Sequence, residues 1–297
     1  MSKIGFIGLG NMGAGMAANL VKGGHAVRAF DLAPAALERA WGAGCSIAAS
    51  AADAVAAAEV VITMLPAGKH VRDVWQTHVV AGTPAGALLI DCSTIDVESA
   101  RFVAGLAAQA GFRVADAPVS GGIMAADAGT LAFMVGCETA DFADVEAVLT
   151  PMARAVIHAG GAGAGQAAKI CNNMLLGISM LGVCEAFALA ESLGLDPERF
   201  FEIANKSSGQ CWSLSTYCPW PGPVPTAPSN RSYEGGFLSA LMLKDLKLAQ
   251  EAAANCGATT PMGAQAEALY ALFDRLGYGQ KDFSAVLQLM RGRLDEL

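Results

Sequence analysis

The chain of 297 residues is long enough for two domains, each with its own core. Its formal net charge of -8 argues against the basic surface that nucleic-acid partners require. Although the mean hydropathy is positive, the longest apolar run, Met174 to Cys184, falls short of the ~18 residues that a membrane span needs. We therefore expect a cytoplasmic protein with no leader segment and no membrane contact.

The cysteines and histidines show no pattern typical of a metal site. The 8 cysteines include no Cys-x-x-Cys pair, and the 4 histidines lack the spacing of metal ligands. We expect the cysteines to be small apolar packing residues in a reducing compartment, with no disulfide framework and no bound metal.

The first segment with a functional pattern is a strand followed by a glycine turn and a helix. Ile4 to Ile7 predicts an apolar strand, and Ala14 to Val21 predicts a helix. Between them the pattern Gly-x-Gly-x-x-Gly allows a tight turn, a close backbone approach to a pyrophosphate, and close packing of helix and strand. The pyrophosphate would lie at the positive end of the helix dipole. The predicted cofactor-binding residues here are Gly8, Leu9, Gly10, Asn11, Met12 and Gly13.

Asp31 completes this dinucleotide pattern. It ends a second predicted strand, His25 to Phe30, about 20 residues after the glycines. A carboxylate there accepts hydrogen bonds from the ribose hydroxyls and repels a 2′-phosphate. The alternative is an incidental acidic residue after a strand; we predict NAD in preference to NADP.

Strands and helices then alternate as far as residue 160. Strands are predicted at 60–65, 87–91, 113–116, 131–136 and 156–158, and helices at 35–43, 70–75 and 97–110. This order predicts an α/β fold with a Rossmann-type, doubly wound parallel sheet, which we assign to an NAD-binding domain over residues 1–163. Ligands of such sheets bind beyond the carboxyl ends of the strands, where Leu65-Pro66, Ser93-Thr94 and Ser120-Gly121-Gly122 lie.

The second half of the chain is predicted to be helical. After the glycine-rich break Gly160 to Gly165, the run Gln166 to Gly194 predicts one helix of roughly 40 Å that joins two domains. Its glycines Gly177 and Gly182 suggest close packing against another helix. We assign residues 164–297 to an all-helical substrate and oligomerisation domain. The Pro-rich segment Pro219 to Pro228 predicts either a mobile loop or a rigid set of turns.

Several polar residues could carry chemistry, each with a plain alternative. Lys169 and Asn173 share one face of the long helix, where a desolvated ammonium suits proton transfer, although a surface lysine fits equally well. Ser120-Gly121-Gly122 could hold a carboxylate or form a simple turn. From the residues alone, Lys244-Asp245 is better explained as a solvated pair, and Trp212 and Tyr217 as core aromatics.

Taken together, these motifs resemble the β-hydroxyacid dehydrogenase family over essentially the whole chain. Residues 6–13 resemble its cofactor signature, 116–122 its substrate motif, 165–173 its catalytic helix and 242–249 its carboxy-terminal motif. Residues 207–222 and 279–284 are similar to the branch that acts on 3-hydroxyisobutyrate.

The resemblance implies NAD-dependent oxidation of 3-hydroxyisobutyrate to methylmalonate semialdehyde in valine breakdown, by a homodimer or homotetramer. Lys169 would be the general acid/base, with Asn173 holding the hydroxyl or the carboxylate. The implied substrate-binding residues are Ser120, Gly121, Gly122, Asn173, Trp212, Tyr217 and Asp245. Further implied cofactor contacts are Leu65, Pro66, His70, Thr94 and Lys244.

Departures from the family pattern leave the substrate open. Lys247 replaces a usual glycine, Ser215 and Cys218 replace acidic and amide residues, and Ile123-Met124 enlarges the substrate-motif edge. L-serine and tartronate semialdehyde are the alternative substrates. A non-catalytic cofactor-binding oligomerisation module and an imine reductase are the alternatives of other kinds; the presence of Lys169 argues against both.

Overall fold

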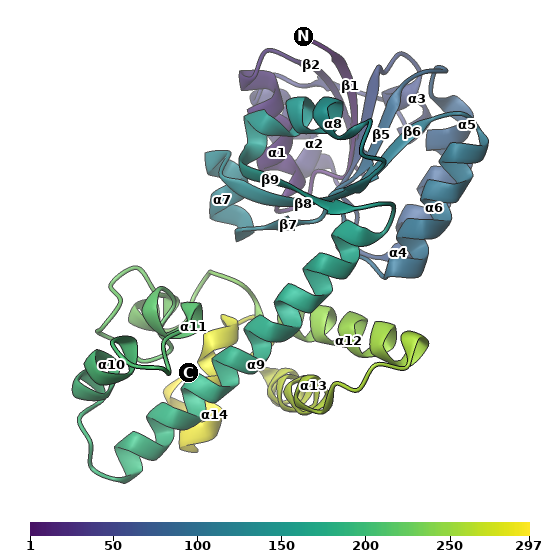
Figure 1. Cartoon of the computed structure of the whole chain (residues 1–297). Helices are drawn as coiled ribbons and strands as arrows, with labels where there is room; N and C mark the ends of the chain where they lie inside the picture. The colour runs from purple at the N-terminus through teal and green to yellow at the C-terminus, as the bar shows by residue number, and fades with distance from the viewer. The chain divides into compact units, whose positions relative to one another are not determined.

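The computed structural model describes residues 1–297 and contains two compact units, Met1–Lys169 and Ile170–Leu297. Unit 1 holds all the β-strands, and unit 2 is helical (Figure 1). Helix α9 (Ala164–Ser192) begins in unit 1 and continues into unit 2. The predicted α/β class, a largely parallel sheet followed by an all-helical part, is confirmed.

One sheet of nine strands organises unit 1, in the order β3-β2-β1-β4-β5-β6-β8-β7, with β9 pairing with β8. The strands are β1 (Lys3–Ile7), β2 (Ala26–Phe30), β3 (Ser46–Ile47), β4 (Val60–Thr63), β5 (Leu88–Asp91), β6 (Arg113–Asp116), β7 (Val119–Ser120), β8 (Leu131–Cys137) and β9 (Ala153–Gly160). The strand order reverses between β1 and β4, and the crevice at such a switch point is where doubly wound sheets bind ligands.

Successive residues of the central strands face opposite sides of the sheet, and helices cover both sides (Figure 1). In β4, Val60 and Ile62 belong to one core and Val61 to the other. The helical elements of unit 1 are α1 (Gly13–Lys22), α2 (Pro34–Gly42), α3 (Ala51–Val55), α4 (Gly68–Val74), the π-helical turn η1 (Trp75–Val79), α5 (Val80–Gly82), α6 (Val97–Gln109), α7 (Gly122–Ala128), α8 (Phe142–Leu149) and η2 (Thr150–Met152).

The sheet is parallel as predicted except around β8. Strand β8 runs antiparallel to both β6 and β7. Alternation of apolar residues marks a strand but not its direction, so the sequence pattern could not distinguish the two pairings. The two-residue strands β3 and β7 were also missed because they are too short to show a period.

Unit 2 packs its helices around a single core. Its further elements are α10 (Pro197–Asn205), α11 (Trp212–Ser215), η3 (Pro228–Arg231), α12 (Ser239–Cys256), α13 (Pro261–Phe273), η4 (Asp274–Tyr278), η5 (Phe283–Ala285), α14 (Val286–Arg291) and η6 (Leu294–Glu296). Close helix packing is confirmed at Gly177, where a Cβ would lie 3.1 Å from Met242 Sδ in α12. At Gly182 the prediction is wrong, since a Cβ there meets nothing within 4 Å.

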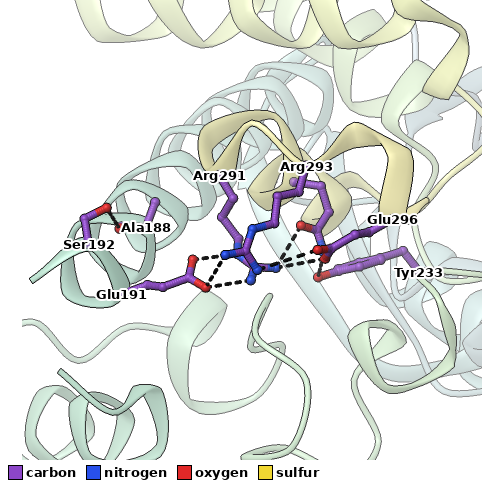
Figure 2. Close-up of polar contacts among 8 residues, drawn as sticks. Ala188, Glu191, Ser192, Tyr233, Arg291, Arg293 and Glu296 are labelled. Carbon is purple, nitrogen blue, oxygen red and sulfur yellow. Dashed lines mark hydrogen bonds and ion pairs between the residues drawn. The ribbon is translucent and has the colours of Figure 1, made fainter. Parts of the chain in front are cut away.

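Arg291 binds the end of the chain to α9 and to the Pro-rich segment. Its guanidinium donates from Nε and Nη2 to the two carboxylate oxygens of Glu191, both at 2.8 Å, as Figure 2 shows. The same group lies over the ring of Trp220, 4.5 Å from its centroid. Ser229 Oγ also donates to Cys218 O, so the Pro-rich segment is an ordered set of turns.

Helix α9 is long and apolar enough to cross a membrane by length and composition. Core helices pass the same test, and 44% of its most apolar 18-residue stretch is buried inside the protein. Met180, Cys184 and Phe187 of α9 are fully buried in the core of unit 2. Their burial favours a core role for this helix.

Candidate functional site

The glycine turn after β1 contains two glycines that the packing requires and one glycine next to open space. Gly8 has a φ of +99°, and a Cβ on it would lie 2.2 Å from Met64 O. A Cβ on Gly13 would lie 2.0 Å from Gly8 O, whereas one on Gly10 would meet nothing within 4 Å. Backbone packing therefore requires Gly8 and Gly13, while Gly10 leaves space for a ligand to approach the main chain.

Helix α1 begins at this turn and suits an anion. Its N-cap residue, Met12, makes no side-chain capping bond, and the first turn carries no acidic residue. Ala14 N donates to Gly10 O at 3.2 Å, but no side chain blocks the N-terminus, so the positive end of the helix dipole can face a phosphate group. Asn11 beside them is exposed, whereas Leu9 is fully buried.

Asp31 is held against the same turn. Its Oδ2 accepts a hydrogen bond of 2.6 Å from Leu9 N, and its Oδ1 accepts one of 2.8 Å from Ala33 N. Each carboxylate oxygen keeps a further lone pair, so Asp31 can still accept hydrogen bonds from ribose hydroxyls. This turn, helix and carboxylate fit an adenine dinucleotide.

The other predicted cofactor residues of unit 1 follow the carboxyl ends of β4 and β5. Leu65 N donates to Ser93 Oγ at 2.8 Å, which links the segment after β4 to the segment after β5. Pro66 and His70 are exposed, and Thr94 is half-buried. These residues thus lie at the carboxyl ends of neighbouring strands, on the same side of the sheet as the glycine turn after β1.

A buried polar network beneath this edge was missed by the sequence analysis. Asp91 Oδ1 accepts hydrogen bonds from Thr63 Oγ1 and Ser93 Oγ, both at 2.6 Å, and Thr63 Oγ1 accepts one from Trp75 Nε1. Burial, the largest influence, raises the pKa of Asp91 to about 6 against these hydrogen bonds. The sequence feature that could have revealed this network is the polar residue that ends each of two apolar strands, Thr63 in β4 and Asp91 in β5.

Asp116 and Gln166 attach the first turn of α9 to the same sheet, and neither was predicted as a site residue. Asp116 Oδ1 accepts a hydrogen bond of 2.7 Å from Gly163 N, and its Oδ2 accepts one of 2.8 Å from Gln166 N. A carboxylate at a helix N-terminus stabilises the helix dipole. Burial nevertheless raises the pKa of Asp116 to about 6.

Lys169 follows Gln166 by one helical turn and is 6% exposed. It is the last residue of unit 1.

The turn after β7 contains the predicted substrate-binding residues of unit 1. Ser120 ends β7 and is half-buried. Gly121 and Gly122 follow it with φ values of +135° and +73°, a backbone conformation that few other residues adopt. The residues after them, Ile123 and Met124, are 43% and 75% exposed.

In unit 2, Asn173 and Asp245 are paired and almost fully buried. Asn173 Nδ2 donates to Asp245 Oδ2, and Asn173 Oδ1 accepts from Asn172 Nδ2 at 3.0 Å. Asp245 Oδ1 lies 3.4 Å from Lys244 Nζ. The solvated pair that the residues alone favoured is therefore wrong for Asp245, which is 3% exposed. Lys247, one turn from Lys244, is exposed.

Trp212 and Tyr217 form a stacked pair with ring centroids 4.9 Å apart, and Trp212 is 50% exposed. Tyr217 OH donates to Asp282 Oδ2 at 2.7 Å. Burial, together with the nearby Asp282 carboxylate, raises the pKa of Tyr217 above its usual value. Tyr217 therefore presents its ring and keeps its proton, and Trp212 presents an aromatic face to solvent.

No group of three or more His, Cys, Asp or Glu side chains is arranged to hold a metal ion. The reactive groups described above are, in unit 1, the Lys169 ammonium, the Ser120 hydroxyl and the backbone N–H groups of the glycine turns, and, in unit 2, the Asn173 amide.

Comparisons with known proteins agree with this geometry. Residues 3–161 match the family model "NAD binding domain of 6-phosphogluconate dehydrogenase", and residues 163–290 match "NAD-binding of NADP-dependent 3-hydroxyisobutyrate dehydrogenase". The chain is 49% identical to a 3-hydroxyisobutyrate dehydrogenase of Pseudomonas aeruginosa over 297 residues, 99% of this chain and 100% of the relative. It is 47% identical to the NAD-dependent L-serine dehydrogenase of the same organism, over 97% of this chain and 98% of the relative.

A solved structure, Mycobacterium tuberculosis 3-hydroxyisobutyrate dehydrogenase with L-serine, has a similar fold. Its TM-score to this chain is 0.95 at 49% identity, covering 98% of this chain and 99% of that one.

Proposed function

The chain belongs to the β-hydroxyacid dehydrogenase family and is an oxidoreductase that uses NAD; from that premise we propose that it oxidises 3-hydroxyisobutyrate to methylmalonate semialdehyde. One observation carries the proposal: Lys169 is buried on a helix turn that is hydrogen-bonded to the carboxyl edge of the nucleotide-binding sheet. This supports the proposal, in which the titratable ammonium of Lys169 acts beside the edge at which such sheets bind their ligands.

The proposed reaction needs a hydride acceptor, a general acid/base and a residue that orients the substrate. NAD, when bound, supplies the acceptor for the hydride that leaves the alcohol carbon. Lys169, in its neutral form, takes the hydroxyl proton, and as an ammonium it returns that proton to the carbonyl oxygen in the reverse direction. Asn173 would orient the hydroxyl or the carboxylate, with its own amide held by Asp245.

The carboxylate of the substrate would be held by Ser120 Oγ and the N–H groups of Gly121 and Gly122. Trp212 offers an aromatic face for the apolar part of the substrate, and Tyr217 supports it through their stacked rings. The proposed cofactor contacts are the glycine turn with Asp31, together with Leu65, Pro66, His70, Thr94 and Lys244. Asp31 favours NAD over NADP in this proposal because its carboxylate would repel a 2′-phosphate.

L-serine is the second candidate substrate. The relative named NAD-dependent L-serine dehydrogenase is nearly as similar to this chain as the 3-hydroxyisobutyrate dehydrogenase, and the M. tuberculosis structure is described with L-serine. Both substrates share the β-hydroxyl and the carboxylate and differ only at the carbon between them. Tartronate semialdehyde reduction would use the same groups.

The deciding experiment measures kcat/KM from the absorbance of NADH or NADPH with 3-hydroxyisobutyrate, L-serine, 3-hydroxypropionate and glycerate, each with NAD and with NADP. The highest kcat/KM for 3-hydroxyisobutyrate with NAD supports the proposal and a role in valine breakdown. Preference for L-serine would move the assignment to the second candidate, and preference for NADP would contradict the role of Asp31.

We further propose that residues 1–163 form the NAD-binding part and residues 164–297 the substrate and oligomerisation part of a homodimer or homotetramer. Sedimentation equilibrium of the intact chain and of its NAD complex tests the assembly. A cytoplasmic location is part of this proposal, and the eight free thiols fit a reducing compartment.

A further inference from the structure

Gln166 uses both ends of its side-chain amide in a fully buried position. Its Nε2 donates to Ser93 O at 2.7 Å, and its Oε1 accepts from Ile95 N at 3.1 Å. The two bonds bracket Thr94, the residue between those two main-chain groups. A side chain on α9 therefore closes a hydrogen-bonded ring with the segment that follows β5.

The pairing has a strict chemical requirement. The buried carbonyl of Ser93 needs a donor and the buried amide of Ile95 needs an acceptor, and an unmet partner of either kind is costly. A carboxylate cannot donate, and an ammonium or guanidinium cannot accept. Among residues of this length, glutamine alone meets both needs in its normal charge state.

The backbone around Gln166 is equally constrained. Its own N–H donates to Asp116 Oδ2, and a Cβ added at Gly165 would lie 2.3 Å from Met134 O. These contacts allow the first turn of α9 only one position against the sheet of unit 1. Lys169 follows Gln166 by three residues, so the two side chains leave the helix on the same face.

We propose that Gln166 is a positioning residue that couples the Ser93–Ile95 segment to Lys169 and so sets where the ammonium lies relative to the main chain at Thr94. The inference rests on the proposed function, since Thr94 is a proposed cofactor contact and Lys169 the proposed acid/base. Gln166 itself transfers no proton; it acts through the geometry of its neighbours.

Two variants of the full chain separate this role from a general loss of packing. Gln166→Met removes both bonds at nearly constant volume, and Gln166→Glu keeps the acceptor for Ile95 N but loses the donor to Ser93 O. The matched control is Gln288→Met, which removes a buried glutamine that accepts from Arg291 Nη1 in the core of unit 2. Each protein is assayed for thermal midpoint, NAD dissociation constant, kcat and KM.

We expect kcat to fall about 10- to 100-fold in both Gln166 variants, because small displacements of a catalytic group carry penalties of that order. The dissociation constant and KM for NAD should change by less than about threefold. The control should lower the thermal midpoint and leave kcat unchanged. A kcat within about threefold of the unmodified protein in a folded Gln166 variant would overturn the proposal, as would an equal loss of NAD binding and turnover.

Amide hydrogen exchange supplies a readout that does not depend on the substrate assignment. If the coupling exists, we expect faster exchange at Ile95 in Gln166→Met, which loses its acceptor, and faster exchange at Lys169 in both Gln166 variants, with no change in the Gln288 variant. Unchanged exchange at Lys169 would refute it. If the unmodified protein oxidises no β-hydroxyacid, the proposed function fails, and the exchange measurement still decides whether Gln166 couples these segments.

Discussion

Asn173 donates a hydrogen bond from its Nδ2 to Oδ2 of Asp245, with 2.5 Å between the two atoms. Because Asn172 donates to the other end of the same amide, the orientation of Asn173 is determined by its neighbours. Asp245 was predicted to line the substrate pocket. Asp245 is buried and bonded to Asn173, so we expect any effect of Asp245 on the substrate to pass through Asn173.

Asp245→Ala should lower kcat/KM about 10- to 100-fold. A hydrogen bond to a charged group contributes roughly 1.5–3 kcal/mol, and its loss leaves the amide of Asn173 held by Asn172 alone. Steady-state kinetics with the preferred β-hydroxyacid measure the effect. Lys247→Ala, an exposed change on the same helix, is the control, and a kcat/KM of Asp245→Ala within twofold of that control would contradict the prediction.

Lys169→Ala should reduce turnover by about 10³-fold while the NAD dissociation constant stays nearly constant, because general acid–base catalysis contributes roughly 10²–10⁴-fold. Lys169→Arg should be equally inactive, since a guanidinium does not release its proton. Lys206→Ala, at an exposed position, provides the reference. Substantial turnover by either Lys169 variant would rule out the acid/base role.

The glycine turn offers a direct test of which glycine serves the fold and which serves the ligand. Gly13→Ala places a methyl group 2.0 Å from Gly8 O and should lower the free energy of unfolding by about 1–3 kcal/mol. Gly10→Ala meets nothing within 4 Å and should fold with unchanged stability but bind NAD at least about tenfold more weakly. Urea unfolding and NAD titration separate the two effects. Wild-type NAD affinity in Gly10→Ala would argue against a close pyrophosphate.

Asp91 should make stability depend on pH. Its pKa of about 6 in the folded protein exceeds the ordinary 3.8, so the folded state holds this proton more tightly than the unfolded state. Its contribution to the free energy of unfolding is therefore complete below pH ~4 and lost as the pH rises through ~6, a decrease of up to roughly 3 kcal/mol. Asp91→Asn should remove the pH-dependent part of the free energy of unfolding that Asp91 contributes, and leave the part that Asp116 contributes. Urea unfolding curves recorded across this pH range measure the difference. Parallel pH profiles for the two proteins would refute the assignment.

The Arg291 cluster of Figure 2 should matter for stability alone. The Arg291 side chain is 7% exposed and makes a two-pronged bond to Glu191, so Arg291→Met should cost about 2–4 kcal/mol in the free energy of unfolding. Arg199→Met breaks a pair whose side chains are 72% and 57% exposed and should cost less than about 1 kcal/mol. Equal costs for the two changes would show that burial of the cluster contributes nothing.

Much of this protein could be predicted from local patterns. The strand before Gly8, the spacing of the glycines and the acid at position 31 depend on residues close in sequence, and the structure places them together at one turn. The long helix was predicted within two residues at each end because its composition is helical throughout and glycine flanks both ends. Those features are determined by backbone sterics and side-chain periodicity, which the sequence states directly.

What only the tertiary structure decided are the relationships between distant residues. The antiparallel pairing of β8, the burial of Asp91 and the bridge from Gln166 to the segment after β5 join positions 20 to 73 residues apart. A buried carboxylate and a solvated one have the same letter in a sequence, as Asp245 shows. The two differ in desolvation and in the hydrogen-bond partners that long-range packing supplies. The same long-range packing buries Asp91, Asp116 and Gln166 beneath the nucleotide-binding edge of the sheet.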